Sequence, residues 1–269
     1  GRTILAILGI CLAVLSMTLL GSVGLGVIAT GEEKFDQSGR DLWVTGGPVQ
    51  LAPGTVGGFE NTVYDAHVIS TDIAQRPDVN SAVPLAFQTV YVSANGSEYE
   101  TLIGTGSPAR ADSVQITEGS AFSTGDTHYA DGAYDGPMTH EVVISPQTAE
   151  QYNVSVNDTL YIGGSIGSAQ RNEFQVVGIS PTFSRFLGTP TVVLPLSELQ
   201  EVTGTTSNDQ ATMITVDVSD DASVTQVESD LQEAYPEYDV RTNREQLQAT
   251  LERQAVLIAA GGSLVILAA

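Results

Sequence analysis

A long uncharged stretch near the N-terminus constrains this chain more than any other feature. No charged residue occurs between Arg2 and Glu32, and Thr3–Ala29 is rich in Leu, Ile, Val and Gly. About 20 apolar residues are enough for a helix to cross the ~30 Å hydrocarbon core of a bilayer. A cleaved signal peptide has an apolar region of only ~7–15 residues. The stretch therefore predicts a retained transmembrane helix.

A second apolar stretch ends the sequence. It runs from Ala255 to Ala269 and predicts the beginning of another span, with both ends of the chain cut from a larger protein. One large domain, from Glu32 to Gln254, would lie between the two spans. Arg2 flanks the first span on one side, and nearly all acidic residues lie on the other. By the positive-inside rule, we expect a cell-membrane protein with a cytoplasmic N-terminus and an extracellular domain.

The charge balance is strongly acidic. The formal net charge is −22, from 32 acidic and 10 basic residues. Disorder is disfavoured because 42% of residues are hydrophobic, and a nucleic-acid partner is disfavoured because basic residues are few. At molar salt the Debye length falls to ~3 Å, so repulsion among surface carboxylates costs little. The composition therefore indicates a halophile, and we expect an archaeon. Cys11 is the single cysteine, so no intrachain disulfide can form.

The last part of the large domain has the clearest secondary-structure pattern. Met213–Val218 alternates as a strand does, and Val227 and Leu231 recur at helical spacing in the segment that follows. A strand at 238–240 then completes a β-α-β unit. Next, Asn243 is expected to cap a stalk helix that would transmit movement between the domain and the membrane. The expected stalk positions are Asn243, Leu247 and Leu251.

The first part of the domain predicts a second β-α-β unit. Its strands are Leu42–Val44 and Val79–Ser93, the latter interrupted at Pro84, and its helix is capped by Ser70–Asp72 and ends before Pro77. We expect an α+β fold in which the two units form one split β-α-β (ferredoxin-like) sheet around a β-rich insertion. The expected divisions are 1–31 (first transmembrane helix), 32–99 (first half of the β-α-β subdomain), 100–204 (β-rich insertion), 205–242 (second half) and 243–269 (stalk and start of the second transmembrane helix).

Several short patterns follow one another in an order that has a known counterpart. They are Asp41–Val44, Ser70–Ile73 before Pro77–Val79, Ile103-Gly104, Glu118-Gly119, Val142–Ser145 with Ala149, Val156–Leu160, Phe174–Ile179, and Val193–Leu196 with Leu199-Gln200. In this order the chain resembles the MacB/FtsX-type permease subunits of ABC transporters. The resemblance covers their first span, their extracytoplasmic domain and the start of their second span.

The resemblance implies a four-span permease that forms a dimer in the membrane lipid and binds cytoplasmic ABC ATPase subunits. Its outer domain would couple ATP-driven motion to export or release of a substrate (mechanotransmission), and it would not itself be an enzyme. The third and fourth spans are absent from this sequence, and no ATPase domain precedes Arg2. The adaptor that bacterial relatives bind is not expected here, because a halophilic archaeon has no outer-membrane duct. The alternative function is a membrane-anchored cell-surface binding protein.

No catalytic or cofactor-binding residue is expected. Gly163–Gly167 fits G-x-S-x-G, but the hydrolase elbow requires a helix after the turn, and here the pattern predicts a strand. The loop starting at Gly104 loosely matches a dinucleotide-binding loop, which Pro108 and the lack of a following helix disfavour. The sequence has no nucleotide-binding P-loop.

Two kinds of surface site remain open. His128 lies among Asp126, Asp131 and Asp135, which could hold a cation such as Ca²⁺. A solvated acidic loop accounts for the same residues and is the preferred interpretation, so no metal is expected. Three sequons offer glycosylation sites in the outer domain, with the third least suited because the resemblance places a tight strand start there. They begin at Asn95, Asn153 and Asn157.

Overall fold

The computed structural model describes residues 40–47, 50–51, 59–60, 62–107, 114–130 and 132–245. The two expected membrane segments, Thr3–Ala29 and Ala255–Ala269, lie outside these ranges. Within the described ranges, no helix combines the length and the apolar character needed to cross a bilayer. The mixed α+β class is confirmed for the part of the chain that the structure describes.

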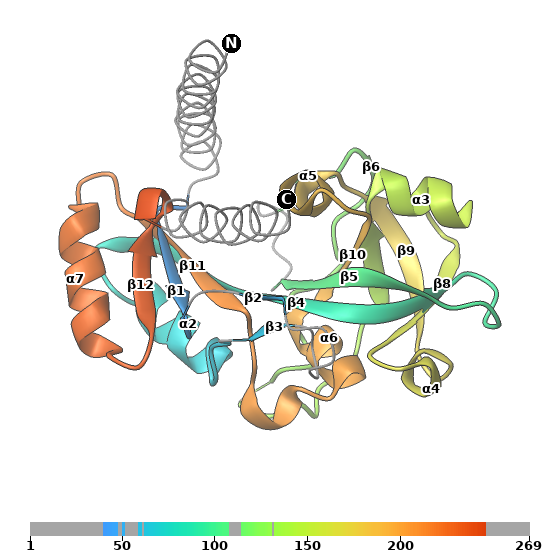
Figure 1. Cartoon of the computed structure of the whole chain (residues 1–269), viewed down its shortest axis with the longest axis horizontal. Helices are drawn as coiled ribbons and strands as arrows, with labels where there is room; N and C mark the ends of the chain where they lie inside the picture. Colours follow the sequence, from blue (N-terminus) through green and yellow to red (C-terminus); the bar gives the residue numbers. More distant parts are fainter. Residues whose placement is uncertain are drawn as a thin grey trace, which may run out of the picture.

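The two flanks of the domain form one unit, the core subdomain (Figure 1). Its elements are β1 (Leu42–Thr45), α2 (Ala66–Ala74), the first half of β4 (Val79–Ser93), β11 (Met213–Val218), α7 (Val224–Ala234) and β12 (Asp239–Thr242). The strand order is β12-β1-β11-β4. β1 is antiparallel to both β11 and β12, and β11 is antiparallel to both β1 and β4. Each β-α-β unit therefore holds a strand of the other between its own two strands.

The middle of the chain forms a second unit, the ring subdomain. Its elements are β5 (Glu100–Ser107), β6 (Glu118–Gly119), β7 (Glu141–Ile144), α3 (Pro146–Tyr152), β8 (Thr159–Gly163), α4 (Ile166–Ala169), β9 (Glu173–Ile179), α5 (Thr182–Leu187), β10 (Thr191–Pro195) and α6 (Leu196–Thr203), with η2 (Thr206–Asn208) leading back to β11. β2 (Gln50–Leu51) and β3 (Phe59–Glu60) form a separate two-stranded sheet.

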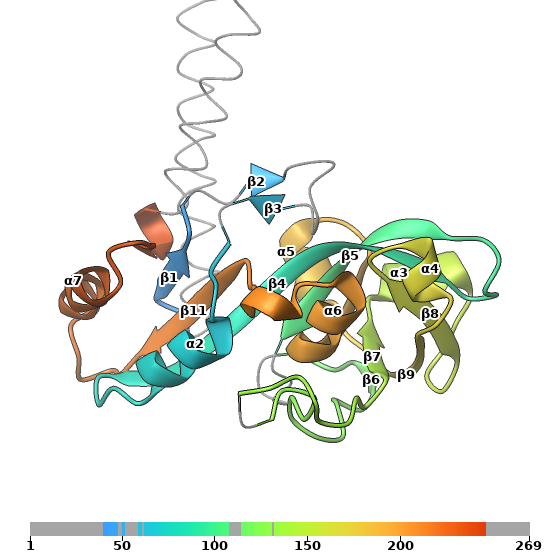
Figure 2. The same cartoon turned by 90° about the horizontal axis from the view of Figure 1, so that it is seen from below.

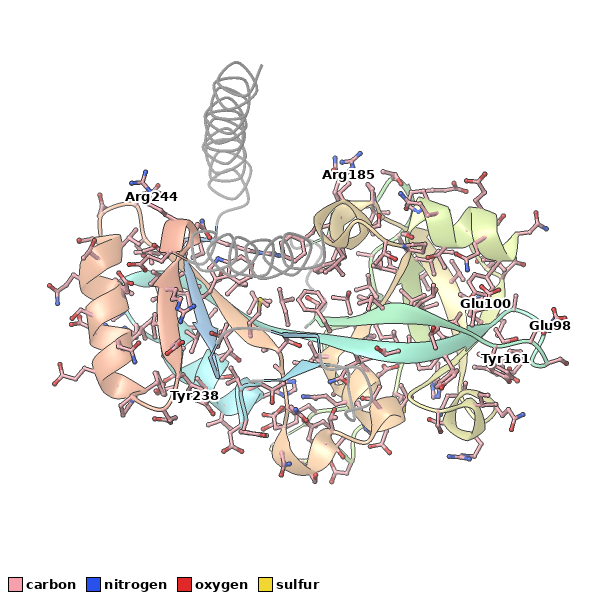
Figure 3. The ribbon with its side chains drawn as sticks, viewed as in Figure 1. Glu98, Glu100, Tyr161, Arg185, Tyr238 and Arg244 are labelled. Carbon is pink, nitrogen blue, oxygen red and sulfur yellow. The ribbon has the colours of Figure 1, made fainter. Side chains whose placement is uncertain are left out.

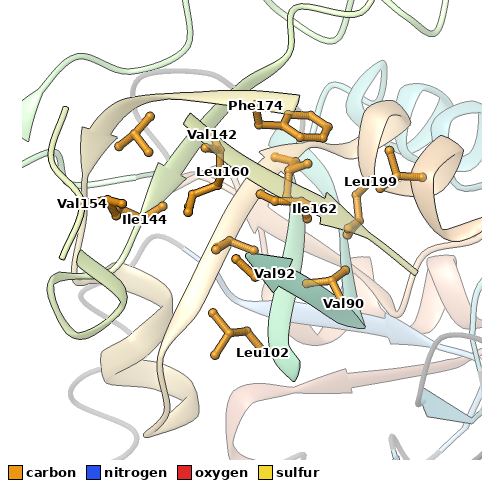
Figure 4. Close-up of a cluster of buried hydrophobic side chains, with 14 of the residues drawn as sticks. Val90, Val92, Leu102, Val142, Ile144, Val154, Leu160, Ile162, Phe174 and Leu199 are labelled. Atoms are coloured by element: carbon orange, nitrogen blue, oxygen red, sulfur yellow. The ribbon is translucent and has the colours of Figure 1, made fainter. Parts of the chain in front are cut away.

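The strands of the ring subdomain close on themselves. The pairing runs from β4 through β5, β10, β7 and β9 to β8, and β8 pairs with β4 again. Closure leaves these strands without an open edge, and the interior is filled by buried side chains such as Phe174, Leu160 and Val92 (Figure 4). α6 packs against the ring through Leu199, which lies where a side chain on Gly104 would collide. The glycines of the loosely matched dinucleotide loop are thus strand residues that allow the helix to pack closely.

β4 is a single strand that serves both subdomains. Its residues Val79–Leu85 pair with β11, and Ala86–Val92 pair with β5. The interruption expected at Pro84 is wrong, because the strand continues through it. At Pro84, β4 pairs with β11 on one side only. The backbone nitrogen of Pro84, which has no N–H to donate, can therefore lie on the unpaired side. The boundary between the subdomains therefore falls inside a continuous strand, between Leu85 and Ala86.

Alternation along the strands separates the two faces of the sheet. Leu42 and Val44 of β1 face the core beneath α2 and α7, whereas Trp43 between them faces the opposite side. Figure 2 shows α2 and α6 on one face, with α5 behind on the other. On that second face Trp43 joins Phe87 and Phe183 in a separate apolar cluster.

Two local expectations are wrong. A helix, α4, does follow Gly163-Gly164, because the hydroxyl of Ser165 accepts from the N–H of Ser168 as an N-cap does. α2 begins at Ala66 rather than after Ser70–Asp72. The hydroxyls of Ser70 and Thr71 donate to the carbonyl of His67, so these residues lie inside the helix.

Candidate functional site

The chain enters and leaves the core subdomain at adjacent strands. β1 and β12 pair in register from Leu42 with Thr242 to Thr45 with Asp239. The buried side chain of Asn243 ties the two ends together. Its Oδ1 accepts from the indole nitrogen of Trp43 at 2.5 Å, and its Nδ2 donates to the carbonyl of Arg40 at 2.6 Å. We call this set, Arg40, Trp43 and Asn243, the clamp.

The helical turn after β12 starts one residue earlier than expected. Asn243–Glu245 are helical, and the capping hydrogen bonds come from Thr242. The N–H of Glu245 donates to Thr242 Oγ1 at 3.3 Å, and the N–H of Thr242 donates to Glu245 Oε2 at 3.0 Å. This reciprocal pair is a capping box. The expectation that Asn243 is the cap is therefore wrong, because its side chain serves the clamp; Leu247 and Leu251 lie outside the described residues.

A pair of carboxyl groups lies beside this turn. Burial of Glu228 on α7, together with the hydrogen bond and charge of Glu245, raises the pKa of Glu228 to about 7. The hydrogen bond from the N–H of Thr242 is the main cause that lowers the pKa of Glu245. Near neutral pH one proton is therefore shared between Glu228 on α7 and Glu245 in the turn after β12.

A polar cluster joins the two subdomains on the face that carries α2 and α6. Its centre is His67 in the first turn of α2. Nδ1 of His67 lies 2.6 Å from Oδ1 of Asp209, in the segment after η2, and Nε2 lies 3.1 Å from Oδ2 of Asp126, in the loop before β7. The N–H of His67 also donates to Asp209 Oδ2 at 2.7 Å. We call His67, Asp126 and Asp209 the junction triad.

Neighbouring groups hold the triad in place. Tyr129 stacks on the imidazole with ring centroids 3.9 Å apart, and the hydroxyl of Tyr134 donates to Asp209 at 2.8 Å. Asp126 accepts from both the N–H and the hydroxyl of Ser197 at the start of α6. Burial acts to lower the pKa of His67, but the hydrogen bonds and charges of Asp126 and Asp209 outweigh it and raise the pKa to about 9. At neutral pH the triad is therefore an imidazolium between two carboxylates.

The acidic loop is not arranged as a cation site in the part that the structure describes. Asp126 faces His67 and Ser197, and Asp135 is exposed to solvent. Nδ1 of His128 donates to the carbonyl of Gly136 at 2.7 Å. Asp131 lies outside the described residues. Among the residues described, no group of three or more His, Cys, Asp or Glu side chains could hold a metal ion.

Aromatic rings join the subdomains on the opposite face. Phe186 of α5 stacks with Trp43 of β1 at a centroid distance of 6.3 Å. Phe87 of β4 lies 6.2 Å from both Phe183 and Phe186. The junction therefore has an ionic contact on one face and an aromatic contact on the other, with β4 between them.

The profile of the MacB-like periplasmic core domain matches residues 3–234, which include the ring subdomain and all of the core subdomain except β12. The chain belongs to the MacB-like periplasmic core domain family. No curated protein sequence matches it.

Two solved structures show the MacB-like fold of the chain. The periplasmic region of MacB from Actinobacillus actinomycetemcomitans has a TM-score of 0.57 and 13% identity, covering 83% of this chain and 98% of that one. The extracellular domain of the noncanonic ABC-type transporter YknZ from Gram-positive bacteria has a TM-score of 0.50 and 13% identity, covering 75% and 98%. At these identities the similarity concerns the fold alone.

The three sequons of this MacB-like domain all begin at exposed asparagines. Asn95 lies in the turn between β4 and β5, where its Oδ1 accepts from the N–H groups of Ser97 and Glu98. Asn153 ends α3 with a φ of 50°, and Asn157 has a φ of 79°. Their use for glycosylation stays a prediction.

Sequence reasoning missed the junction triad of the MacB-like domain. Asp126 was singled out, but as a cation ligand, and neither His67 nor Asp209 carried a local signal. His67 is separated from its partners by 59 and 142 residues. The only hint in the sequence is that His67 and Asp209 lie among apolar and hydroxyl-bearing residues. Many solvated surface segments have the same composition, so this hint does not mark a site.

Proposed function

We propose that this domain is the extracytoplasmic part of a permease subunit of an ABC transporter, and that it couples ATP-driven motion of the membrane helices to export or release of a substrate. The observation that carries the proposal is the pairing of β1 with β12 and their connection through Asn243. Membrane helices attached at Arg40 and after Glu245 would meet the domain at the same edge. A displacement of either helix would then pass directly into the core sheet.

The distribution of basic side chains supports a membrane on this side. Arg244, directly after the clamp, and Arg185 of α5 project from the same side of the molecule (Figure 3). Both are exposed, in a chain whose net charge is −22. Cationic side chains next to a bilayer are attracted to anionic headgroups. We infer an N-terminus in the cytoplasm, a first transmembrane helix at Thr3–Ala29 and an extracellular domain.

The partners follow from the family. MacB-like core domains belong to ABC transporter permease components, which work with an ATPase. We propose that a separate cytoplasmic ABC ATPase subunit hydrolyses ATP for this chain and that two copies of the permease assemble in the membrane. We further propose that transmembrane helices 3 and 4 follow in the full-length protein, and that the substrate leaves outside the bilayer.

Co-purification from native membranes tests the role. The full-length protein is tagged, solubilised in high salt and analysed by intact-mass spectrometry together with whatever it retains. We expect an ABC ATPase in equal amount, retained by the wild type and by the Asn243→Ala variant, because the clamp lies outside the bilayer. Purification of the tagged chain with no ATPase, in several detergents and in native lipid particles, would favour the alternative function, a membrane-anchored cell-surface binding protein.

We also propose a halophilic, archaeal source, which the charge of −22 and the single lysine, Lys34, support. Surface carboxylates repel one another less as the Debye length shortens from ~10 Å at 0.1 M salt to ~3 Å at 1 M. The midpoint of thermal unfolding should therefore rise steadily between 0.1 and 2 M KCl. Sucrose of equal osmolality is the control, and an unfolding temperature that rises equally in sucrose would remove this support.

A further inference from the structure

The two nitrogens of His67 each face a carboxylate oxygen. The distances are 2.6 Å to Asp209 and 3.1 Å to Asp126. An ionised carboxylate can only accept, and a neutral imidazole has one N–H to donate. Both oxygens of Asp126 are also occupied as acceptors, since the N–H of Ser197 lies 3.2 and 3.1 Å from them. Between two ionised carboxylates, this geometry fits the doubly protonated imidazolium.

The two bonds of His67 differ in what they join. Asp209 also accepts from the N–H of His67, and it lies on the segment that leads into β11 of the core subdomain. Asp126 belongs to the loop before β7 and is fixed to Ser197 at the start of α6, both in the ring subdomain. The longer, single bond to Asp126 therefore spans the junction, as do the bonds that Tyr134 and Gln200 of α6 donate to Asp209. Of these bonds, the one to Asp126 is the bond that a neutral His67 would lose.

We propose that the imidazolium of His67 is a latch that holds the α2 face of the junction closed, and that loss of its proton to solvent lets the two subdomains swing apart about β4. The opposite face supplies the fulcrum, because Trp43 and Phe186 remain stacked there when the ionic face opens. The pivot lies between Leu85 and Ala86, where β4 changes its pairing from β11 to β5. The latch is a property of the domain and does not depend on the proposed transport role.

The groups around His67 agree with this assignment. The loop before β7 contributes Asp126, Tyr129 and Tyr134, the segment after η2 contributes Asp209, and Asp65 precedes α2. Tyr134 stays protonated well above neutral pH, because burial raises its pKa and the hydrogen bond to Asp209 adds to this. The next titratable side chains are those of His128 and Glu201, whose Nε2 and Oε2 atoms lie 3.7 Å apart. The raised pKa of His67, about 9, sets the range in which the latch opens.

A distance measurement between the subdomains tests the latch. Cys11 is replaced by serine, and Ser229→Cys on α7 and Gln147→Cys on α3, both exposed, carry nitroxide labels for electron-spin distance measurement in the full chain. We expect one narrow distance distribution at pH 6.5. Above pH 9 the ratio of a second, longer distance to the first should rise about tenfold per pH unit, following the loss of the imidazolium.

Three variants separate the latch from other causes. His67→Gln should show the second distance at both pH values, and His140→Asn, an exposed histidine of the ring subdomain, should behave as the wild type. Asp126→Asn keeps the shape of the side chain but loses its charge, so the transition should move to lower pH. An unchanged distance between pH 6.5 and 10 would overturn the latch, as would a pH effect that persists in His67→Gln. If His67→Gln does not fold, an unshifted transition in folded Asp126→Asn overturns it equally.

Discussion

The side-chain oxygen of Asn243 accepts a 2.5 Å hydrogen bond from the indole nitrogen of Trp43, across 200 residues of sequence. The same side chain donates to the carbonyl of Arg40 at 2.6 Å. One buried amide therefore fixes the position of Arg40, just before β1, relative to the turn that follows β12. A rigid connection at this point is what the proposed coupling to membrane helices would need.

Replacing Asn243 with alanine should destabilise the domain. The buried indole N–H loses this acceptor, and the Arg40 carbonyl loses its donor, at a cost of roughly 1–3 kcal/mol. Trp43 is the only tryptophan, so its fluorescence during urea unfolding reports the change directly. Asn208→Ala, at an exposed position in η2, is the control and should change stability by less than about 0.5 kcal/mol. Equal unfolding midpoints for the two variants would contradict the clamp.

Removing the hydroxyl of Thr212 should weaken the point where β4 changes partners. Thr212 Oγ1 accepts from the N–H of Phe87 at 2.8 Å, and its own N–H donates to Leu85 at 2.8 Å. Thr212→Val removes this acceptor from the Phe87 N–H, at a cost of roughly 1–3 kcal/mol. Amide hydrogen exchange at Phe87 should accelerate most. Thr215→Val is the matched control. It removes only a longer, 3.3 Å hydrogen bond to the carbonyl of Val83, so amide hydrogen exchange around that bond should change less.

The charged His67 should make stability depend on alkaline pH. Its folded pKa of about 9 lies above the ordinary 6.5, so its contribution is fully present below pH 6.5 and is lost as pH rises through 9. A shift of this size corresponds to about 3 kcal/mol. Urea unfolding at pH 6 and at pH 10 should show the loss in the wild type and not in His67→Gln. A parallel loss in both proteins would assign it to other groups.

Glu228 should also make stability fall as pH rises, but at lower pH than His67 does. Its pKa is raised to about 7 by burial and by Glu245, so the folded state binds a proton more tightly than the unfolded state does. The associated stability is present at low pH and falls as pH rises from the ordinary value through 7. Glu228→Gln should therefore raise the free energy of unfolding at pH 8 and change it little at pH 5. The expected gain is only roughly 0.5 kcal/mol, because the site is partly exposed. Glu233→Gln, also on α7, is the control.

The elements that sequence reasoning found are those with a local signature. β11, α7 and β12 follow from alternation in Met213–Val218 and from the helical spacing of Val227 and Leu231. The β4–β5 turn contains Asn95-Gly96, a pair that favours tight hairpin turns, and Gly96 has a φ of 69°. These patterns depend on neighbours within a few residues, so a single sequence displays them.

The features that sequence reasoning missed depend on distant residues. Pro84 is compatible with a strand only because β4 has a single neighbour there, which the chain order alone does not reveal. The same holds for the closure of β8 on β4 and for the meeting of His67 with Asp209. Hydroxyls at Ser70 and Thr71 matched a helix start, yet they bond backwards to His67, and only the surrounding packing decides between the two.

The interleaving of the two β-α-β units has a consequence for how the protein is made. Val44 of β1 pairs with Ile214 of β11, so β1 must wait for 170 further residues to be synthesised (214 − 44) before it gains a partner. The closed ring, whose strands all lie between those two positions, can fold first, and β4 then offers its free edge to β11 as it emerges. Contacts this distant in sequence fold slowly and leave strands open to misassembly in the meantime. Nascent β1 is therefore the segment on which a chaperone at the exit of the translocation pore would have the greatest effect.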